Sequence, residues 1–530
     1  MKSNQIICSA LLLGFSLAAA VAQTNSLPLT PIADGPFQPD DQSLQQYQCP
    51  EWFRDAKLGI WAVWGPESVP MQGDWYARRL YLHDQTDKNG KPTGSDADNK
   101  YHVEHYGHPS KVGFKDIIPL WKAEKWDPDR LMERYQKAGA KYFCMIAMHH
   151  DNFDCWNSKY QPKWNSVNLG PKRDIAGEWQ AAAKKHGLRF GMTEHLAASW
   201  WFYSAAHGAD KTGPLAGVPY DGNDPKFSDL YWSGNEQPTF SYYGTNVPFA
   251  YKQNWFNRIK DMVDRYHPDL LYSDSPLPYP DEVGRQLLAH YYNDNLARHG
   301  GKLEAVYNCK QTSQGRWVQD LERGVMDGIE PHPWQTDTCV GQWYYKTGIK
   351  YKSSATVIQM LADIVSKNGN LLLNFPPRPD GTLDDDELKI LSDLAAWTAV
   401  NGEAIFGTRP WKIYGEGSSK VVKAGSFNEG KLQYTASDIR FTQSKDGKTL
   451  YAIALGWPAD GTLMIKSLAS AAGKINELAM LGHGDRPDWK QTAEGLVVIL
   501  PPRKPGETIF ALNIAGENLR PVAGVNEIRK

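Results

Sequence analysis

Between residues 52 and 400, short apolar segments alternate with longer segments that have the roughly 3.6-residue apolar period of an amphipathic helix. The short segments are apolar at nearly every position, which is typical of strands buried on both faces of a parallel sheet. We therefore predict strands at 57–64, 141–148, 188–193, 270–272, 305–308 and 371–374. The amphipathic segments predict helices at 128–138, 175–186, 254–266, 281–298 and 354–366.

This repeated order of helix and strand predicts a (β/α) barrel, because crossover helices join consecutive parallel strands. After Asn401-Gly402 the pattern changes to alternating strand-like segments, such as 421–424, 449–456 and 495–500. Such segments, separated by turns rich in Gly, Asp, Asn and Pro, predict an antiparallel β-sandwich. We expect the barrel to span residues 47–407 and the sandwich to span residues 408–530.

The first residues combine Lys2, an apolar run and small residues up to Ala22, which is the pattern of a cleavable signal peptide at 1–22. The chain is therefore expected to be secreted or periplasmic. Residues 23–46 lack periodicity and predict a linker or surface strap. Since no other segment approaches ~18 consecutive apolar residues, no membrane span is expected.

The charge balance argues against highly charged partners. The sequence has 58 basic and 60 acidic residues, with a formal net charge of -2, so nothing favours nucleic acid or an anionic membrane. The 20 Trp and 26 Tyr suit oligo- or polysaccharides, because aromatic planes stack on sugar rings, although large cores also hold aromatic residues. The scattered cysteines predict neither a zinc site nor a disulfide framework, and no cofactor is expected.

Polar side chains follow several of the predicted strands, and such residues converge on one site in a (β/α) barrel. They are Asp74 and Trp75, His149 and His150, Glu194 and His195, and Asp274.

These residues also have simpler explanations. One alternative is that His149 and His150 form a metal pair, but adjacent residues at a strand end point to different faces, and no third ligand has matching spacing. We therefore expect hydroxyl recognition and no metal. Asp274 could cap a loop, and Glu194 with His195 could form an ion pair that stiffens one.

The chain resembles glycoside hydrolase family 29, the α-L-fucosidases, over nearly all of its mature length. One similar segment runs from Lys57 to Pro70 (Lys-Leu-Gly-Ile-Trp-Ala-Val-Trp-Gly-Pro-Glu-Ser-Val-Pro), and another is Pro268-Asp269-Leu270-Leu271-Tyr272-Ser273-Asp274. The others lie at 74–76, 138–143, 149–151, 368–374, 376–381 and 401–407.

The resemblance implies a retaining exo-glycosidase with two carboxyl groups about 5–5.5 Å apart. Asp274 matches the nucleophile. The positions that contact the sugar are matched by Trp61, Asp74, Trp75, His149, His150 and Tyr272, with Tyr272 against C5 and its substituent.

The first departure from the family concerns the acid/base residue. Many relatives have Trp-Glu where this chain has Trp334-Gln335, and a Gln side chain cannot donate a proton as an acid. The first replacement candidate is Glu322 and the second is Glu330, with His332 and Asp337 as outside candidates. Loss of the acid would leave a carbohydrate-binding protein on an inactive hydrolase scaffold as an alternative function.

The second departure is Val63, where relatives usually place a His that touches the sugar. An apolar pocket discriminates poorly against an added hydroxyl, and Glu194 and His195 would suit the extra C6 hydroxyl of L-galactose. An exo-α-L-galactosidase is therefore a further alternative with the same mechanism.

Overall fold

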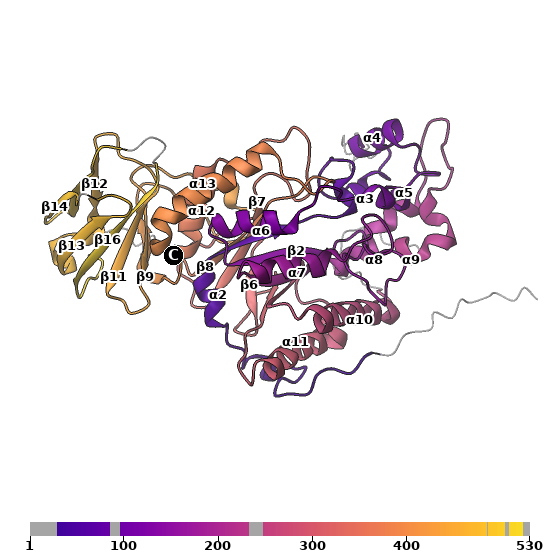
Figure 1. Cartoon of the computed structure of the whole chain (residues 1–530), viewed down its shortest axis with the longest axis horizontal. Coiled ribbons are helices and arrows are strands. Elements are labelled where there is room, and N and C mark those ends of the chain that lie inside the picture. Colours follow the sequence, from indigo (N-terminus) through magenta and orange to yellow (C-terminus); the bar gives the residue numbers. More distant parts are fainter. Residues whose placement is uncertain (1–28, 85–95, 233–246, 485, 504–507, 523–530) are drawn as a thin grey trace, which may run out of the picture.

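The computed structural model describes residues 29–84, 96–232, 247–484, 486–503 and 508–522, so the predicted signal peptide lies outside the described residues. Eight parallel strands close into a barrel in chain order, which confirms the predicted fold (Figure 1). The strands are β1 (Leu58–Ala62), β2 (Tyr142–Met148), β3 (Arg189–Glu194), β4 (Leu270–Ser273), β5 (Val306–Cys309), β6 (Val318–Asp320), β7 (Trp334–Cys339) and β8 (Gly369–Asn374). Closure is made by β8, which pairs with β1 through Leu372 and Gly59.

Strands β6 and β7 were not predicted from the hydrophobic pattern. β7 reads Trp-Gln-Thr-Asp-Thr-Cys, yet all six residues are buried. Polar side chains are stable there because they bond to one another inside the barrel, and such a strand has no apolar signature in the sequence.

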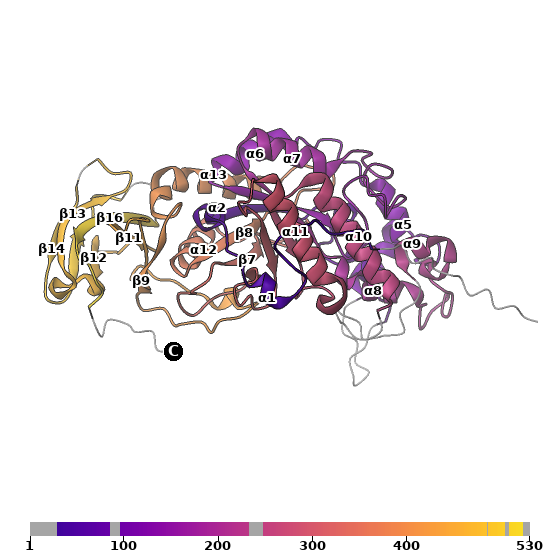
Figure 2. The same cartoon turned by 90° about the horizontal axis from the view of Figure 1, so that it is seen from below.

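Amphipathic helices cover the outside of the barrel. For example, α6 starts where the Asp127 side chain accepts a hydrogen bond from the Arg130 N–H, and it buries Leu131 and Tyr135. In Figure 2, α10 and α11 lie side by side along the barrel. The main helices are α2 (Glu51–Ala56), α6 (Pro128–Lys137), α7 (Ile175–Lys185), α10 (Phe249–Tyr266), α11 (Arg285–Arg298), α12 (Ser354–Ser366) and α13 (Asp385–Asn401).

Two local features differ from a plain helix-strand alternation. The helix predicted at 281–298 begins with a π-helical turn, Pro280–Gly284, before α11. The segment predicted as a strap contains α1 (Asp41–Leu44) and is bound to α11, where His290 Nδ1 lies 2.9 Å from Ala33 N and Asn293 Oδ1 lies 3.0 Å from Phe37 N.

Short helices in the loops that follow β1 and β3 gather at the end of the molecule farthest from the C-terminal domain (Figure 1). They are α3 (Tyr76–Arg79), α4 (Ala97–His105), α5 (Phe114–Ile117), α8 (Ser199–Phe202) and α9 (Ser228–Tyr231). These loops build walls around the carboxyl ends of the strands, where a barrel enzyme carries its site.

The C-terminal domain consists of two antiparallel sheets around their own core, as predicted. The five-stranded sheet has the order β13-β16-β11-β10-β9 and the three-stranded sheet the order β12-β15-β14. The strand predicted at 421–424 is wrong, because those residues lie in the connection between β9 and β10. The strands are β9 (Arg409–Glu416), β10 (Ile439–Gln443), β11 (Thr449–Ala454), β12 (Thr462–Ile465), β13 (Lys474–Met480), β14 (Asp488–Gln491), β15 (Leu496–Ile499) and β16 (Phe510–Glu517).

Candidate active site

A pocket of about 500 Å³ opens at the carboxyl ends of the barrel strands. Nine of the residues predicted from the sequence line it: Trp61, Val63, Asp74, Trp75, His149, His150, His195, Asp274 and Glu322. It is also lined by Asp337, one of the outside candidates for the acid, and by Arg79, Lys310, Trp343, Ser426 and Phe427, which were not predicted. The polar residues that follow different strands thus converge on one cavity.

Asp274 directly follows β4, and its backbone N–H donates to the carbonyl of Glu194 at the end of β3. Its carboxylate lies 2.5 Å from Lys310 Nζ and 3.0 Å from His195 Nδ1, and it accepts a hydrogen bond of 3.2 Å from the Tyr272 hydroxyl. Burial opposes ionisation, but Lys310 and His195 outweigh it and hold the pKa of Asp274 well below its usual value. Asp274 is therefore an anion at neutral pH.

Glu322 lies two residues after the end of β6, and its carboxylate contacts the same Lys310 Nζ. Burial and the nearby charge of Asp274 raise the pKa of Glu322, although Lys310 acts in the opposite direction. One lysine thus joins two carboxyl groups whose pKa values shift in opposite directions.

Lys310 was not predicted as a site residue. It is the first residue after β5, so the rule that polar residues after barrel strands face the site would have found it. The strand end was overlooked because the predicted strand stopped at residue 308.

Three histidines form one wall of the pocket. The ring centroids of His149 and His150 are 4.4 Å apart, and both rings lie within 5.5 Å of the His195 ring. His149 Nδ1 lies 2.5 Å from Glu67 Oε1, and His150 Nδ1 lies 2.6 Å from the carbonyl oxygen of His195. Burial lowers the pKa of His149 and His150 to about 3, so both are neutral imidazoles that can exchange hydrogen bonds with hydroxyl groups.

The structure brings a third imidazole, that of His195, to His149 and His150, although no third ligand has matching spacing in the sequence. One ligand atom from each of the three lies within 4.8 Å of the others. The sequence spacing gave no sign of this, since His195 reaches the pair from the next strand. Zinc bound by three imidazoles needs Zn–N distances of about 2.0–2.1 Å, so the cluster could hold an ion only after the rings draw closer.

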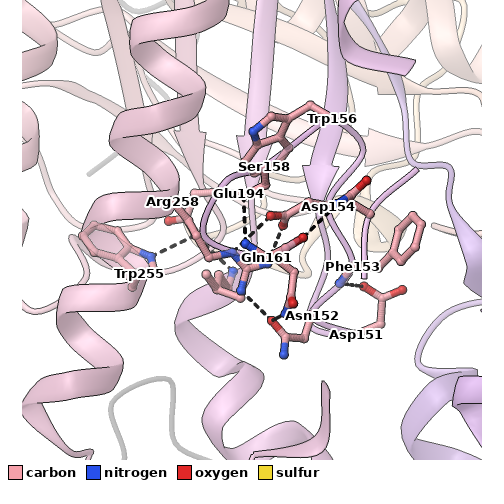
Figure 3. Close-up of polar contacts among 12 residues, drawn as sticks. Asp151, Asn152, Phe153, Asp154, Trp156, Ser158, Gln161, Glu194, Trp255 and Arg258 are labelled. Carbon is pink, nitrogen blue, oxygen red and sulfur yellow. Dashed lines mark hydrogen bonds and ion pairs between the residues drawn. The ribbon is translucent and has the colours of Figure 1, made fainter. Parts of the chain in front are cut away.

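The loop after β2, which carries His149 and His150, is anchored from behind by α10. Arg258 forms an ion pair with Asp154 and donates a hydrogen bond of 2.5 Å to Asn152 Oδ1, and both partners belong to the loop after β2 (Figure 3). Such a buried, hydrogen-bonded pair holds the loop in one geometry.

Several buried polar atoms at the pocket lack a hydrogen-bond partner within the described part of the chain. They include Trp61 Nε1, Asp74 Oδ1, His195 Nε2 and Asp337 Oδ1. An unpaired buried polar atom costs about 1–3 kcal/mol, so a ligand with hydroxyl groups that bond to these atoms would gain affinity. Burial also raises the pKa of Asp74 to about 7, so this carboxyl can donate or accept.

Two residues predicted to touch the substrate lie behind the pocket wall instead. Glu194 accepts hydrogen bonds from the Leu196 N–H at 3.0 Å and from Trp255 Nε1 at 3.1 Å (Figure 3). Tyr272 is fully buried, and its hydroxyl lies 3.2 Å from Asp337 and 3.3 Å from Asp320, beneath the nucleophile candidate. Neither side chain is among the residues that line the pocket, so their contact with a substrate stays a prediction.

Trp334 and Gln335 were also predicted at the site, and the structure contradicts this. They begin β7, so they lie at the amino end of the barrel strands. Gln335 is buried, where its amide accepts a hydrogen bond of 2.9 Å from Tyr142 and donates one of 2.9 Å to Asp320. It therefore does not occupy the position of a missing acid.

Glu330 precedes β7 at the same end of the barrel. Its backbone N–H donates to the Lys367 carbonyl and its own carbonyl accepts from Asn368, just before β8. Its prediction as a catalytic acid is wrong, because the pocket is at the opposite end. Asp337, an outside candidate for the acid, lines the pocket, and its carboxyl group accepts a hydrogen bond from Tyr272. Of the two glutamates proposed as the acid, Glu322 is the one that lines the pocket and contacts Lys310.

Comparison of the chain with known proteins points to a single family. The α-L-fucosidase family model matches residues 27–403, and the model of the α-L-fucosidase C-terminal domain matches residues 433–515. The tissue α-L-fucosidase of Rattus norvegicus is 28% identical, covering 92% of this chain and 93% of that protein. The plasma α-L-fucosidase of Homo sapiens is 28% identical, covering 88% of each. The α-fucosidase of Thermotoga maritima, solved in complex with fucose, is 26% identical with a TM-score of 0.66, covering 90% of this chain and 99% of that one.

The resemblance inferred from the sequence motifs is thereby confirmed, and this chain belongs to the α-L-fucosidase family of glycoside hydrolases.

Proposed function

We propose that the protein is a retaining exo-α-L-fucosidase in which Asp274 is the nucleophile and Glu322 is the acid/base residue. The observation that carries this assignment is the Lys310 ammonium group, which contacts both carboxyl groups. Because both carboxylates contact one nitrogen, they lie close together, as a retaining glycosidase with carboxyl groups roughly 5–5.5 Å apart requires. Their opposite pKa shifts suit an ionised nucleophile and a protonated acid.

The reaction follows from these roles. Asp274 attacks the anomeric carbon while Glu322 protonates the departing glycosidic oxygen, so a glycosyl ester forms and the aglycone leaves as an alcohol. Glu322, now a carboxylate, removes a proton from water, which attacks the same carbon and releases Asp274. Two displacements at one carbon return the sugar with its original configuration.

The rest of the pocket suits one terminal sugar. Neutral His149 and His150 and the Asp74 carboxyl face the cavity with hydrogen-bonding atoms, and Trp75 and Trp61 supply aromatic surface. The inactive-scaffold alternative rested on Gln335, which lies at the other end of the barrel, so it has no remaining support in the pocket.

The acid assignment is tested with Glu322→Gln. Hydrolysis of a fucosyl oligosaccharide should fall by about 10²-fold or more, because its leaving group needs the proton. An activated aryl fucoside needs no proton, so it should lose much less in the glycosylation step, and azide should trap the intermediate as fucosyl azide. The alkaline limb of the pH profile should flatten, because it reports loss of the Glu322 proton.

The matched control is Glu330→Gln, the same change at the opposite end of the barrel, which should behave as the parent. Hydrolysis of the oligosaccharide by Glu322→Gln at the parental rate would contradict the assignment.

Turnover of α-L-galactosides is a second candidate activity. Val63 lines the pocket where relatives usually have His, and an apolar wall rejects an added hydroxyl by only about 10²-fold. Glu194 no longer supports it, because its side chain is bound behind the wall. We therefore expect fucosides to be preferred, as measured by the ratio of the two kcat/KM values.

Export is the remaining part of the proposal. Residues 1–22 have the pattern of a signal peptide, and among the described helices none has the length and apolar character needed to cross a membrane. N-terminal sequencing of the exported protein, expected to begin at Gln23, tests this.

A further inference from the structure

The active-site pocket is completed by a segment of the C-terminal domain. Ser426 and Phe427 line it, and they belong to residues 417–438, which join β9 to β10. We propose that this segment forms the subsite for the leaving group, and that Phe427 stacks on the sugar to which the fucose is attached. The inference rests on the proposed function, because it uses Glu322 as the acid.

The segment is fixed to the barrel beside Glu322. Gly425 and Val325 exchange backbone hydrogen bonds of 3.0 and 3.2 Å, and the Phe427 N–H donates to the Glu322 carbonyl at 2.8 Å. The Glu429 N–H then donates to the Arg323 carbonyl at 3.0 Å. Because these bonds run along the residues that carry the acid, the position of Phe427 is set relative to Glu322.

Glu429 adds a side-chain contact to this attachment. Its carboxylate lies 3.0 Å from Lys352 Nζ, and only 10% of the Glu429 side chain is exposed. A backbone ladder together with a sheltered ion pair gives the segment one defined place on the barrel.

Within the described part of the chain, Phe427 belongs to neither of the two hydrophobic cores. The residue is 64% exposed, more than the other large apolar residues that the structure describes as exposed. Its φ of 57° lies in the left-handed region, which is unfavourable for a bulky side chain. An exposed aromatic ring held in a strained conformation at the rim of a site is typical of a ligand contact.

The position of the acid indicates which part of the substrate contacts the Phe427 ring. The acid must touch the glycosidic oxygen, so the leaving group lies on the Glu322 side of the pocket. Trp343 also lines the pocket, and the Arg323 guanidinium lies 5.2 Å from the centre of its ring. Aromatic rings around the leaving group suit a pyranose with an apolar CH face better than a small alcohol.

The test compares two leaving groups in Phe427→Ala. We expect kcat/KM for a fucosyl disaccharide to fall by about 10-fold, because stacking on the second sugar is lost. α-L-Fucosyl fluoride, whose leaving group cannot stack, is the internal reference and should change by less than about 2-fold. Inhibition by free fucose should stay at the parental level.

Two control variants sharpen the result. Phe427→Trp keeps an aromatic ring and should retain most of the disaccharide activity. Phe249→Ala removes another exposed phenylalanine, 49% exposed and outside the pocket lining, and should leave both substrates unaffected.

Each remaining outcome has a definite meaning. Equal losses on the disaccharide and the fluoride would overturn the proposal, because the segment would then act only by positioning Glu322. No loss on the disaccharide would overturn it as well. If the parent fails to hydrolyse fucosyl fluoride, the proposed function itself fails, and this outcome is distinguishable from the other two.

Discussion

Two buried charge clusters in this protein differ in their ratio of cations to carboxyl groups. In the pocket, one cation, Lys310, lies between two carboxyl groups, Asp274 and Glu322. At the junction of the two domains, one carboxylate, Asp363 of α12, lies 2.8 Å from Lys367 Nζ and 2.6 Å from Arg440 Nε of β10.

The proportions have different consequences for stability. If one pocket carboxylate is neutralised, the lysine keeps the other as a partner. If Asp363 is neutralised, two buried cations lose their shared partner, and this is expensive in a medium of low dielectric constant. We therefore expect the pocket cluster to change protonation at little cost in stability, and the junction cluster to contribute strongly to stability.

The largest expected effect is the loss of catalytic turnover on substitution of Asp274 in the pocket cluster. Asp274→Asn keeps the shape but cannot form the glycosyl ester, so kcat should fall by about 10³–10⁵-fold. Unfolding temperature should change little, because Lys310 retains Glu322. Kinetics with an aryl fucoside and a thermal unfolding scan check both statements, and calorimetry should still detect fucose binding. An Asn variant with full activity would refute the nucleophile assignment.

The second prediction concerns the junction. Asp363→Asn should reduce the free energy of unfolding by about 3–5 kcal/mol, because Lys367 and Arg440 stay buried without a carboxylate. The kcat of the folded fraction should be unchanged, because Asp363 is not part of the pocket lining. Denaturant titration and active-site-normalised kinetics measure the two quantities.

A surface pair provides the control for this experiment. Asp281 forms an exposed ion pair with Arg285, and 85% of its side chain is accessible. Asp281→Asn should have little effect, since solvent screens such pairs. A junction variant no less stable than this control would show that the cluster does not contribute strongly to stability.

The sequence predicted the barrel and much of the pocket because both follow from local patterns. Asp274, His149 and His150 were identified because they are polar residues that directly follow predicted apolar strands in the sequence. β7 was missed because its polar side chains are paired inside the barrel, which no hydrophobic pattern reveals. Gln335 and Glu330 were misplaced for the same reason: without β7, the end of the barrel on which they lie could not be assigned.

Phe427 is the clearest case that local patterns could not resolve. It is separated from Glu322 in the sequence by β7, α12, β8, α13 and β9, yet the two are joined by a backbone hydrogen bond. The contact depends on how the domains pack, and the residues before it were predicted as a strand because apolar residues recur there. Lys310, by contrast, follows β5 directly and was within reach of sequence reasoning.

The smallest predicted effect is a change of specificity at Val63, which carries no charge and lines the pocket close to its charged centre. Its backbone N–H donates to Asn374 Oδ1 at 2.9 Å, so a new side chain would extend from a fixed point. Val63→His would offer a ring nitrogen to a sugar hydroxyl, and one such hydrogen bond is worth about 0.5–1.5 kcal/mol. Because α-L-fucosidase relatives usually carry His here, we expect the bond to form in the geometry in which fucose binds and less well with L-galactose, so the kcat/KM ratio of fucoside to L-galactoside should rise by about 2- to 10-fold. Val63→Leu adds volume without a hydrogen-bonding atom and should not reproduce the rise. If Val63→His leaves the ratio unchanged, Val63 does not set specificity, and discrimination at C6 must come from the other pocket walls.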